Sequence, residues 1–323
     1  MRGMTDRRTL LTAGTALAAP PTLRAQEPGG WPARPIRFVV PFPPGGTTDI
    51  VARVYAQRMT GTLGQPLVVE NRTGAGGTVG SDAIAKAPPD GYAFVMSNIA
   101  SHAVGPNVYP RVPYDSVRDF THIALLADVP SVLVVAAASP VQDLAGFLAA
   151  ARARPVTIAS PGNGTTSHVL TTTLARLTGA QLTHVPYRGS APGIADVMAG
   201  TVEAMITTLA EAGRNDRVRL LAITSEGRTP GWDAVPTFAE LGLPSMTAPT
   251  WFGLSGPPGL PDAIADRMSA AALDALSTEV VRARLAEFGA VPPAHDRAWY
   301  ARYVAEELAR WGRAAREAGV RAD

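Results

Sequence analysis

Cysteine is absent from this chain of 323 residues. Disulfides, thiolate metal sites and cysteine nucleophiles are therefore excluded. Charged residues make up only 17% of the sequence, and the 29 Lys and Arg nearly balance the 27 Asp and Glu. Because the basic residues are scattered, nothing suggests a nucleic-acid interface. The hydrophobic content of 46% argues against disorder and provides a large core, with enough length for two domains.

Metal-binding and membrane-spanning patterns are also missing. No HxxxH or HExxH spacing occurs among the five histidines, which argues against a zinc site. Beyond the N-terminus, no stretch reaches eighteen uninterrupted apolar residues. We therefore expect a soluble mature protein without a metal or cofactor.

The N-terminus is typical of an exported protein. Arg7 and Arg8 precede the apolar run 10–19, which is too short to cross a membrane, and Ala25 offers a plausible cleavage point. The pattern predicts a signal peptide over residues 1–25 and a periplasmic mature chain. The paired arginines fit either a twin-arginine signal or an ordinary Sec signal that happens to contain them.

The stretch 35–63 predicts a strand, a Pro/Gly turn and an amphipathic helix. The strand covers 36–40, Gly45 and Gly46 form the turn, and Thr47 is among the capping residues of the helix. Such a helix N-terminus is a natural seat for an anion, although many βα turns of this kind bind nothing. The glycines match neither a P-loop nor a Rossmann fingerprint.

The rest of the chain continues to alternate between strands and helices. Further strands are predicted at 66–70, 92–97, 129–138, 156–160, 182–186, 202–208, 218–224 and 251–255. Further helices are predicted at 81–87, 143–152, 169–177, up to 198, 261–276, 279–288 and 296–318. This order predicts a mostly parallel α/β sheet with ligands beyond the strand C-termini. The aromatic stripe of the last helix is expected to pack on a core.

A second possible anion seat follows the strand at 156–160. The loop 161–168 repeats the order of glycine and hydroxyl residues before a helix. Its hydroxyls fit either a carboxylate ligand or a helix cap. His168 fits packing, capping or binding, Tyr187 could form a pocket wall, and Arg188 is either solvated or paired with a second carboxylate.

Several of these segments together resemble one protein family. The matching stretches are PIRFVVPFPPGGTTDIVAR, PLVVENRTGAGGTVGSDAIAKAPPDGY, YDSVRDF, ASPGNGTTSH, HVPYRGSAPGIADVMAG, LLAITS and TWFGLSGPPGLP. In this order and spacing, over about residues 31–318, they resemble the Bug (TctC-type) family. These are extracytoplasmic solute-binding proteins of tripartite tricarboxylate transporters.

The resemblance implies an α/β, two-lobed periplasmic binding protein (clamshell) with a hinge and a ligand cleft between the lobes. We expect lobe 1 to combine residues 31–127 and 245–323, and lobe 2 to cover 128–244. The implied ligand is a small carboxylate, held largely by backbone amides and water. The implied partners are the membrane subunits of the transporter, and the mature chain is expected to act as a monomer without a catalytic residue.

Carried onto this sequence, the family's binding loops and the neutral donors within them give a set of candidate ligand-binding residues. They are Pro44, Gly45, Gly46, Thr47, Asp49, Asn98, Ala100 and Ser101 from lobe 1, and Gly164, Thr165, Thr166, Ser167, His168, Tyr187, Gly189 and Thr207 from lobe 2.

One segment departs from the family pattern. Thr207 and Thr208 stand where the family usually has an Asp-Asn pair, and the segment 209–217 is shortened. Since an acidic position that could receive a ligand amine is then neutral, we expect a preference for amine-free acids.

Two alternative functions remain open at this point. A hydrolase built on Ser167 and His168 is disfavoured, because no G-x-S-x-G elbow surrounds the serine. A ligand sensor that docks on a receptor would use the same clamshell as a transport protein, so the sequence does not separate these two roles.

Overall fold

The computed structural model describes residues 30–291 and 295–322. The expected signal peptide at 1–25 lies outside the described residues. From Trp31 onward the chain forms one compact unit. Within the described residues, no helix is both long and apolar enough to cross a membrane.

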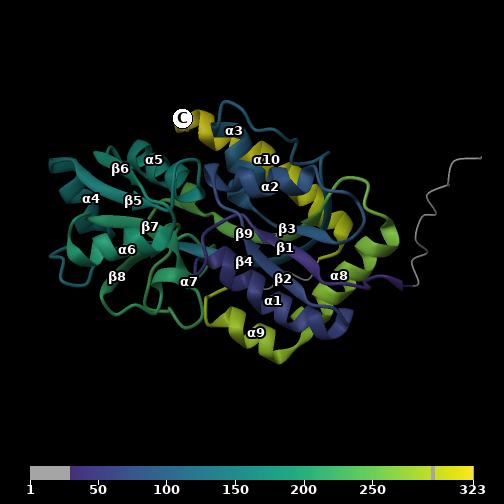
Figure 1. The fold of residues 1–323 in the computed structure, drawn as a ribbon. Coiled ribbons are helices and arrows are strands. Elements are labelled where there is room, and N and C mark those ends of the chain that lie inside the picture. The colour runs from purple at the N-terminus through teal and green to yellow at the C-terminus, as the bar shows by residue number, and fades with distance from the viewer. Residues whose placement is uncertain (1–29, 292–294, 323) are drawn as a thin grey trace, which may run out of the picture. The chain divides into compact units, whose positions relative to one another are not determined.

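The strands of the described residues join in one nine-stranded sheet (Figure 1). They are β1 (Ile36–Val40), β2 (Leu67–Asn71), β3 (Ala93–Asn98), β4 (Thr121–Ala136), β5 (Val156–Ser160), β6 (Leu182–Pro186), β7 (Ala204–Thr208), β8 (Val218–Ile223) and β9 (Pro249–Gly256). Their order is β2-β1-β3-β9-β4-β7-β5-β6, and β8 also pairs with β4. Strands such as β3 are buried along their whole length, which explains their continuous apolar sequences.

The sheet is mixed rather than mostly parallel, so this prediction was wrong. β1 pairs in parallel with β2 and β3, and β5 pairs in parallel with β6 and β7. In contrast, β9 is antiparallel to β3 and β4, and β4 is antiparallel to β7 and β8. Alternating strands and helices predicted the parallel pairs, but β9 follows a long irregular segment and inserts between β3 and β4.

β4 is the longest strand and takes part in two sets of pairings. Its first part, from Thr121 to Pro130, pairs with β9. Its second part, from Ser131 to Ala136, pairs with β7 and β8. The register shifts at three points along β4, so the strand is irregular as it passes from one set of partners to the other. The sequence predicted only the apolar run 129–138 and missed the first half of this strand.

Most helices lie near the predicted positions, although the short helix at 105–108 was not predicted. The helices are α1 (Thr47–Leu63), α2 (Thr78–Ala85), α3 (Gly105–Val108), α4 (Leu144–Ala153), α5 (Thr166–Thr178), α6 (Ser190–Ala199), α7 (Leu209–Ala212), α8 (Asp262–Ser277), α9 (Glu279–Ala286) and α10 (Arg297–Glu317). Short helical turns η2 (Ala75–Gly77), η3 (Ala100–Val104) and η4 (Pro244–Met246) complete the list.

The C-terminal helices pack against elements from the first half of the chain. α8 packs against α1 and β4, and α10 packs against η3, α3 and β4 (Figure 1). The predicted aromatic stripe of α10 buries Tyr300, Val304 and Trp311. An acid also lies in this buried face, because Glu307 accepts hydrogen bonds from the indole N–H groups of Trp251 and Trp311.

Candidate functional site

A cavity of about 310 Å³ lies where several loops at strand ends meet. This volume suits a small metabolite. Its wall is formed by residues 42–48, Ile50, 98–100, Pro161, 165–167, 188–192, Ile194, Thr208, Ala210, Glu211, Thr250 and Phe252. These wall segments include residues that precede and residues that follow position 130 of β4, where its pairing partners change.

Three helices begin at the cavity wall. The first residues of α1, α5 and α6 all line it. The N-cap residues of these helices, Gly46, Thr165 and Gly189, make no side-chain capping hydrogen bond with any described residue. The first N–H groups of a helix have no acceptor within the helix, and the helix dipole makes this end positive. The cavity is therefore suited to an anion without needing a buried cation.

Two buried polar atoms at the wall lack a protein partner. Asn98 Nδ2 and Thr166 Oγ1 have no hydrogen-bond partner among the described residues, although the two residues are only 2% and 4% exposed. The orientation of the Asn98 amide follows from its Oδ1, which accepts a hydrogen bond of 3.0 Å from the Ser101 N–H. An unpartnered buried donor is costly, so both atoms favour a ligand with acceptor oxygens.

The charged groups of the wall are Glu211 and Arg188. Glu211 Oε1 accepts a hydrogen bond of 3.0 Å from the backbone N–H of Thr47, and its Oε2 accepts one from the Thr207 hydroxyl. The expectation of a neutral wall near Thr207 is therefore wrong. The sequence shows that a threonine stands at position 207, where the family usually has Asp. It did not show that the turn of α7 brings Glu211, four residues later, to the same place. The reasoning for an amine-free ligand thus loses its premise.

Ten of the predicted site residues lie in the cavity wall. They are Pro44, Gly45, Gly46, Thr47, Asn98, Ala100, Thr165, Thr166, Ser167 and Gly189.

The structure does not bring the other six predicted residues to this wall. They are Asp49, Ser101, Gly164, His168, Tyr187 and Thr207. Each of them has another role next to the cavity, as the contacts of the individual residues show.

Asp49 holds the Gly-rich turn before α1. Its carboxylate accepts hydrogen bonds from the Gly45 N–H, from Arg53 and from Asn71. Burial by itself would raise the pKa of the Asp49 carboxyl, but these hydrogen bonds outweigh it and hold the pKa below its usual value. Asp49 thus fixes the loop that presents the backbone of α1 to the cavity.

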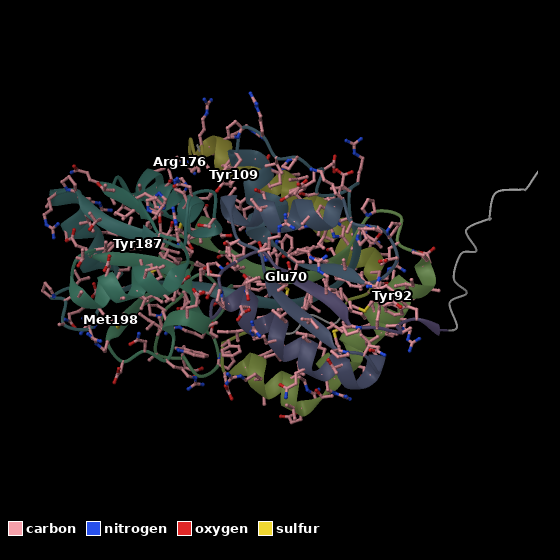
Figure 2. The ribbon with its side chains drawn as sticks, in the orientation of Figure 1. Glu70, Tyr92, Tyr109, Arg176, Tyr187 and Met198 are labelled. Atoms are coloured by element: carbon pink, nitrogen blue, oxygen red, sulfur yellow. The ribbon has the colours of Figure 1, made fainter. Side chains whose placement is uncertain are left out.

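The histidine and tyrosine of the second half of the site face other protein groups. His168 stacks on His184 with 4.0 Å between the ring centroids, and burial lowers the pKa of both rings, that of His184 to about 4. The Tyr187 hydroxyl donates to Asp196 Oδ2 at 2.6 Å, and Tyr187 lines a neighbouring hollow instead of the cavity. Figure 2 labels Tyr187.

The remaining three residues are held by packing or by short-range bonds. Ser101 is fully buried and bonds to the Nδ1 atom of His102 at 2.8 Å. Gly164 has a φ of +68°, and a Cβ there would lie 2.5 Å from Cε2 of Tyr109. Thr207 donates to Glu211, so it acts on the wall through that carboxylate.

Sequence reasoning missed the apolar part of the wall. Phe42, Ile50, Ile99, Ile194 and Phe252 line the cavity. No local pattern marks them, because apolar residues at these spacings also fit an ordinary core. Phe252 in particular reaches the site only through the insertion of β9 beside β3. These side chains suit a ligand with an apolar body between its polar groups.

The described residues contain no group of three or more His, Asp or Glu that could hold a metal ion. Neither His168 nor any other described residue forms a hydrogen bond with the Ser167 hydroxyl, whereas His168 Nδ1 accepts from the Gly164 N–H. The site therefore offers hydrogen-bond donors and apolar walls, which are the elements of a binding pocket.

Comparison with known proteins gives a family match. Residues 51–320 match the model of the tripartite tricarboxylate transporter family receptor, TctC. Protein BugT of Bordetella pertussis is 38% identical over 297 residues, which cover 90% of this chain and 91% of that protein.

Solved structures agree with this match. An R. palustris protein solved with adipate has a TM-score of 0.87 and 35% identity, covering 90% of this chain and 99% of that chain. MatC from Rhodopseudomonas palustris with bound malate has a TM-score of 0.82 and 33% identity, covering 88% and 99%. These similarities confirm the α/β periplasmic binding protein fold and a solute-binding rather than an enzymatic family. The chain belongs to the TctC (Bug) family of extracytoplasmic solute receptors of tripartite tricarboxylate transporters.

Proposed function

We propose that this protein captures a small organic acid in the cavity and delivers it to the membrane subunits of a tripartite tricarboxylate transporter. The ligand class is that of dicarboxylates, tricarboxylates and aromatic carboxylates. The proposal is carried by the three helix N-termini at one cavity wall, together with the unpartnered atoms of Asn98 and Thr166. The adipate and malate bound by structural relatives support this class.

The donors of the wall are sufficient for useful affinity. A hydrogen bond to a charged group contributes about 1.5–3 kcal/mol, and a micromolar complex requires about 8 kcal/mol in total. A few such bonds, with burial of an apolar ligand body, reach this value. We assign ligand contact to the ten predicted residues that line the cavity, with backbone N–H groups as the main donors.

We further propose that the ligand is enclosed by two lobes, formed by residues 31–127 with 245–323 and by residues 128–244. The change of pairing partners along β4 supports a division near residues 128–131. In this scheme β4 is part of the hinge. A ligand favours the closed arrangement only through contacts that the open arrangement lacks.

The mature protein is proposed to act as a periplasmic monomer. The features of residues 1–25 support export, and the family consists of extracytoplasmic receptors.

A thermal-shift screen of the chain from Gln26 tests ligand capture. The panel contains mono-, di- and tricarboxylates, aromatic acids and acidic amino acids. A ligand at one hundred times its Kd adds about 2.7 kcal/mol of stability, and each kcal/mol raises the midpoint by about 2–4 °C. We expect one acid class to raise the midpoint by several degrees.

Mass spectrometry of the denatured protein's supernatant accompanies the screen, because an acid retained from expression would hide a shift. If no acid shifts the midpoint and none is released on denaturation, carboxylate capture is wrong.

A further inference from the structure

The backbone N–H of Thr47 at the start of α1 is already occupied by a protein carboxylate. Glu211 Oε1 accepts from it at 3.0 Å, and a Cβ on the preceding Gly46 would lie 3.3 Å from the same oxygen. The Thr207 hydroxyl holds Oε2, and the Thr47 and Thr208 hydroxyls bond to each other alongside. Glu211 is therefore fixed in the wall at a position that an incoming ligand carboxylate would otherwise use.

The opposite situation holds at α5. Its first residue, Thr166, and the neighbouring wall residue Asn98 present the unpartnered polar atoms described above. No carboxylate of the described residues bonds to either atom. One ligand carboxylate thus has donors waiting for it at α5 and Asn98, while the N-terminus of α1 already holds a negative charge.

The charge of the wall disfavours a second ligand carboxylate. Glu211 is half-buried, whereas Arg188, the other charged lining residue, is exposed and has no hydrogen-bond partner among the described residues. Solvent screens an exposed charge far more than a buried one. The repulsion from Glu211 therefore outweighs the attraction from Arg188, and two like charges in one partly dehydrated cavity oppose each other strongly.

We propose that Glu211 is the specificity-determining residue of this site and that it selects acids with one carboxylate. The second polar group of the preferred ligand is a hydrogen-bond donor, such as a hydroxyl or an ammonium group, which Glu211 accepts. The apolar wall holds the body between these two groups. This inference rests on the proposed capture of an organic acid, and it replaces the dicarboxylates and tricarboxylates of that proposal with acids that carry one carboxylate.

Two matched ligand series test the proposal by isothermal titration calorimetry. The aliphatic series is adipate, 6-hydroxyhexanoate and hexanoate, and the aromatic series is terephthalate, 4-hydroxybenzoate and 4-methylbenzoate. Within each series the ligand body is constant, and only the second group changes from a carboxylate to a donor to a methyl group. The proteins are the wild type, Glu211→Gln and the control Glu226→Gln.

Glu211→Gln retains an oxygen that accepts from the Thr47 N–H while it removes the charge. Glu226 is exposed and lies outside the cavity wall, so Glu226→Gln makes the same change in net charge elsewhere. Circular dichroism and the unfolding midpoint report whether each variant is folded.

In at least one series we expect the wild type to bind the hydroxy acid at least tenfold more tightly than the dicarboxylate. Glu211→Gln should reduce this ratio about tenfold or more by strengthening dicarboxylate binding, and Glu226→Gln should leave it unchanged. A wild type that binds the dicarboxylate as tightly as the hydroxy acid, or more tightly, in both series overturns the proposal even if the variant does not fold. So does a Glu211→Gln protein that changes the affinity of both ligands by the same factor.

The outcomes also separate this inference from the proposed function. If the wild type binds dicarboxylates tightly, the charge selection by Glu211 is wrong but carboxylate capture stands. If no acid in either series or in the wider screen binds, and none is retained from expression, carboxylate capture is wrong and the selection by Glu211 fails with it.

Discussion

At the scale of single residues, two threonines of α5 both have an unpartnered hydroxyl but differ in their surroundings. Thr166 and Thr171 are both buried, and the hydroxyl of neither has a hydrogen-bond partner among the described residues. Only Thr166 lines the cavity. An unpartnered buried hydroxyl reduces stability. At Thr166 this cost is offset when a bound ligand forms a hydrogen bond with the hydroxyl.

Thr166→Val is expected to weaken binding of the ligand found in the screen by about tenfold or more, because a hydrogen bond to a charged group is lost. Valine has nearly the same shape, so folding is retained. Thr171→Val is the control and should leave the affinity unchanged while raising the free energy of unfolding. Calorimetric titration measures the affinities. Equal affinities for all three proteins would exclude Thr166 as a ligand contact.

Asp128 is a half-buried acid near the middle of β4, and its Oδ1 atom is buried. Burial of its carboxyl and the nearby charge of Glu307 raise its pKa to about 7. The folded protein therefore keeps this proton at pH values where the unfolded chain has lost it. The contribution of this carboxyl to the free energy of unfolding is fully present below about pH 4, and it is lost as the pH rises through 7.

Asp128→Asn is expected to remove this pH dependence. Relative to the wild type, the variant should gain about 2–3 kcal/mol more unfolding free energy at pH 8 than at pH 5. Urea unfolding at the two pH values measures the difference, and the comparison with wild type cancels the contributions of other groups. The exposed Asp216→Asn serves as control. An equal effect at both pH values would show that the Asp128 carboxyl does not titrate in this range.

At the scale of elements, the helices differ in how they begin. α4 and α10 are capped by the side chains of Asp143 and Asp296, which accept from backbone N–H groups of their first turns. The helices that begin at the cavity have no such cap. Their first N–H groups are therefore available to a ligand, at a cost in local stability, except the Thr47 N–H of α1, which already donates to Glu211.

Asp143→Ala is expected to lower the unfolding free energy by about 1 kcal/mol through loss of the 2.8 Å bond from the Gly146 N–H. Because α4 does not reach the cavity, the ligand affinity should not change. Denaturant unfolding and calorimetry measure the two quantities, with Asp216→Ala as an exposed control. A fall in affinity without loss of stability would contradict this separation.

Local elements could be predicted from the sequence, but some of their pairings could not. Strands such as β1 and β5 were predicted at their observed bounds, because short apolar runs between turn residues specify them. The antiparallel place of β9 depends on contacts between distant segments, which no periodicity records.

The same limit applies to the site. The helix N-termini with glycine and hydroxyl residues could be predicted, since their donors follow from local sequence. Glu211 could not, because its place depends on how far the turn of α7 carries it toward Thr47. Thr250 and Phe252 were missed for the same reason. They lie in β9, which reaches the cavity only by pairing with strands that are distant in the sequence.

At the scale of the whole molecule, several direct contacts link the proposed lobes beside the cavity. Thr47 bonds to Glu211 and to Thr208, and the Tyr109 hydroxyl donates a 2.8 Å bond to the Asn163 carbonyl oxygen. Figure 2 labels Tyr109 and also Tyr92, whose hydroxyl accepts from the Ala33 N–H within a single proposed lobe.

Tyr109→Phe is expected to loosen the closed arrangement and weaken ligand binding about fivefold, the value of an ordinary hydrogen bond of about 1 kcal/mol. Small-angle X-ray scattering should show a larger radius of gyration for the ligand-free variant than for the wild type. Tyr92→Phe, which removes a hydroxyl bond inside one lobe, should leave both quantities unchanged. If Tyr109→Phe behaves like Tyr92→Phe, the Tyr109 bond does not contribute to closure.

The surroundings of α7 also make the protein suitable for optical study. Of its five tryptophans, only Trp232 falls between residues 128 and 244. Its indole N–H donates at 2.7 Å to the carbonyl oxygen of Gly213, which directly follows the helix that carries Glu211. The emission spectrum therefore contains one tryptophan from the proposed second lobe, and subtraction of the Trp232→Phe spectrum isolates its signal without an added dye.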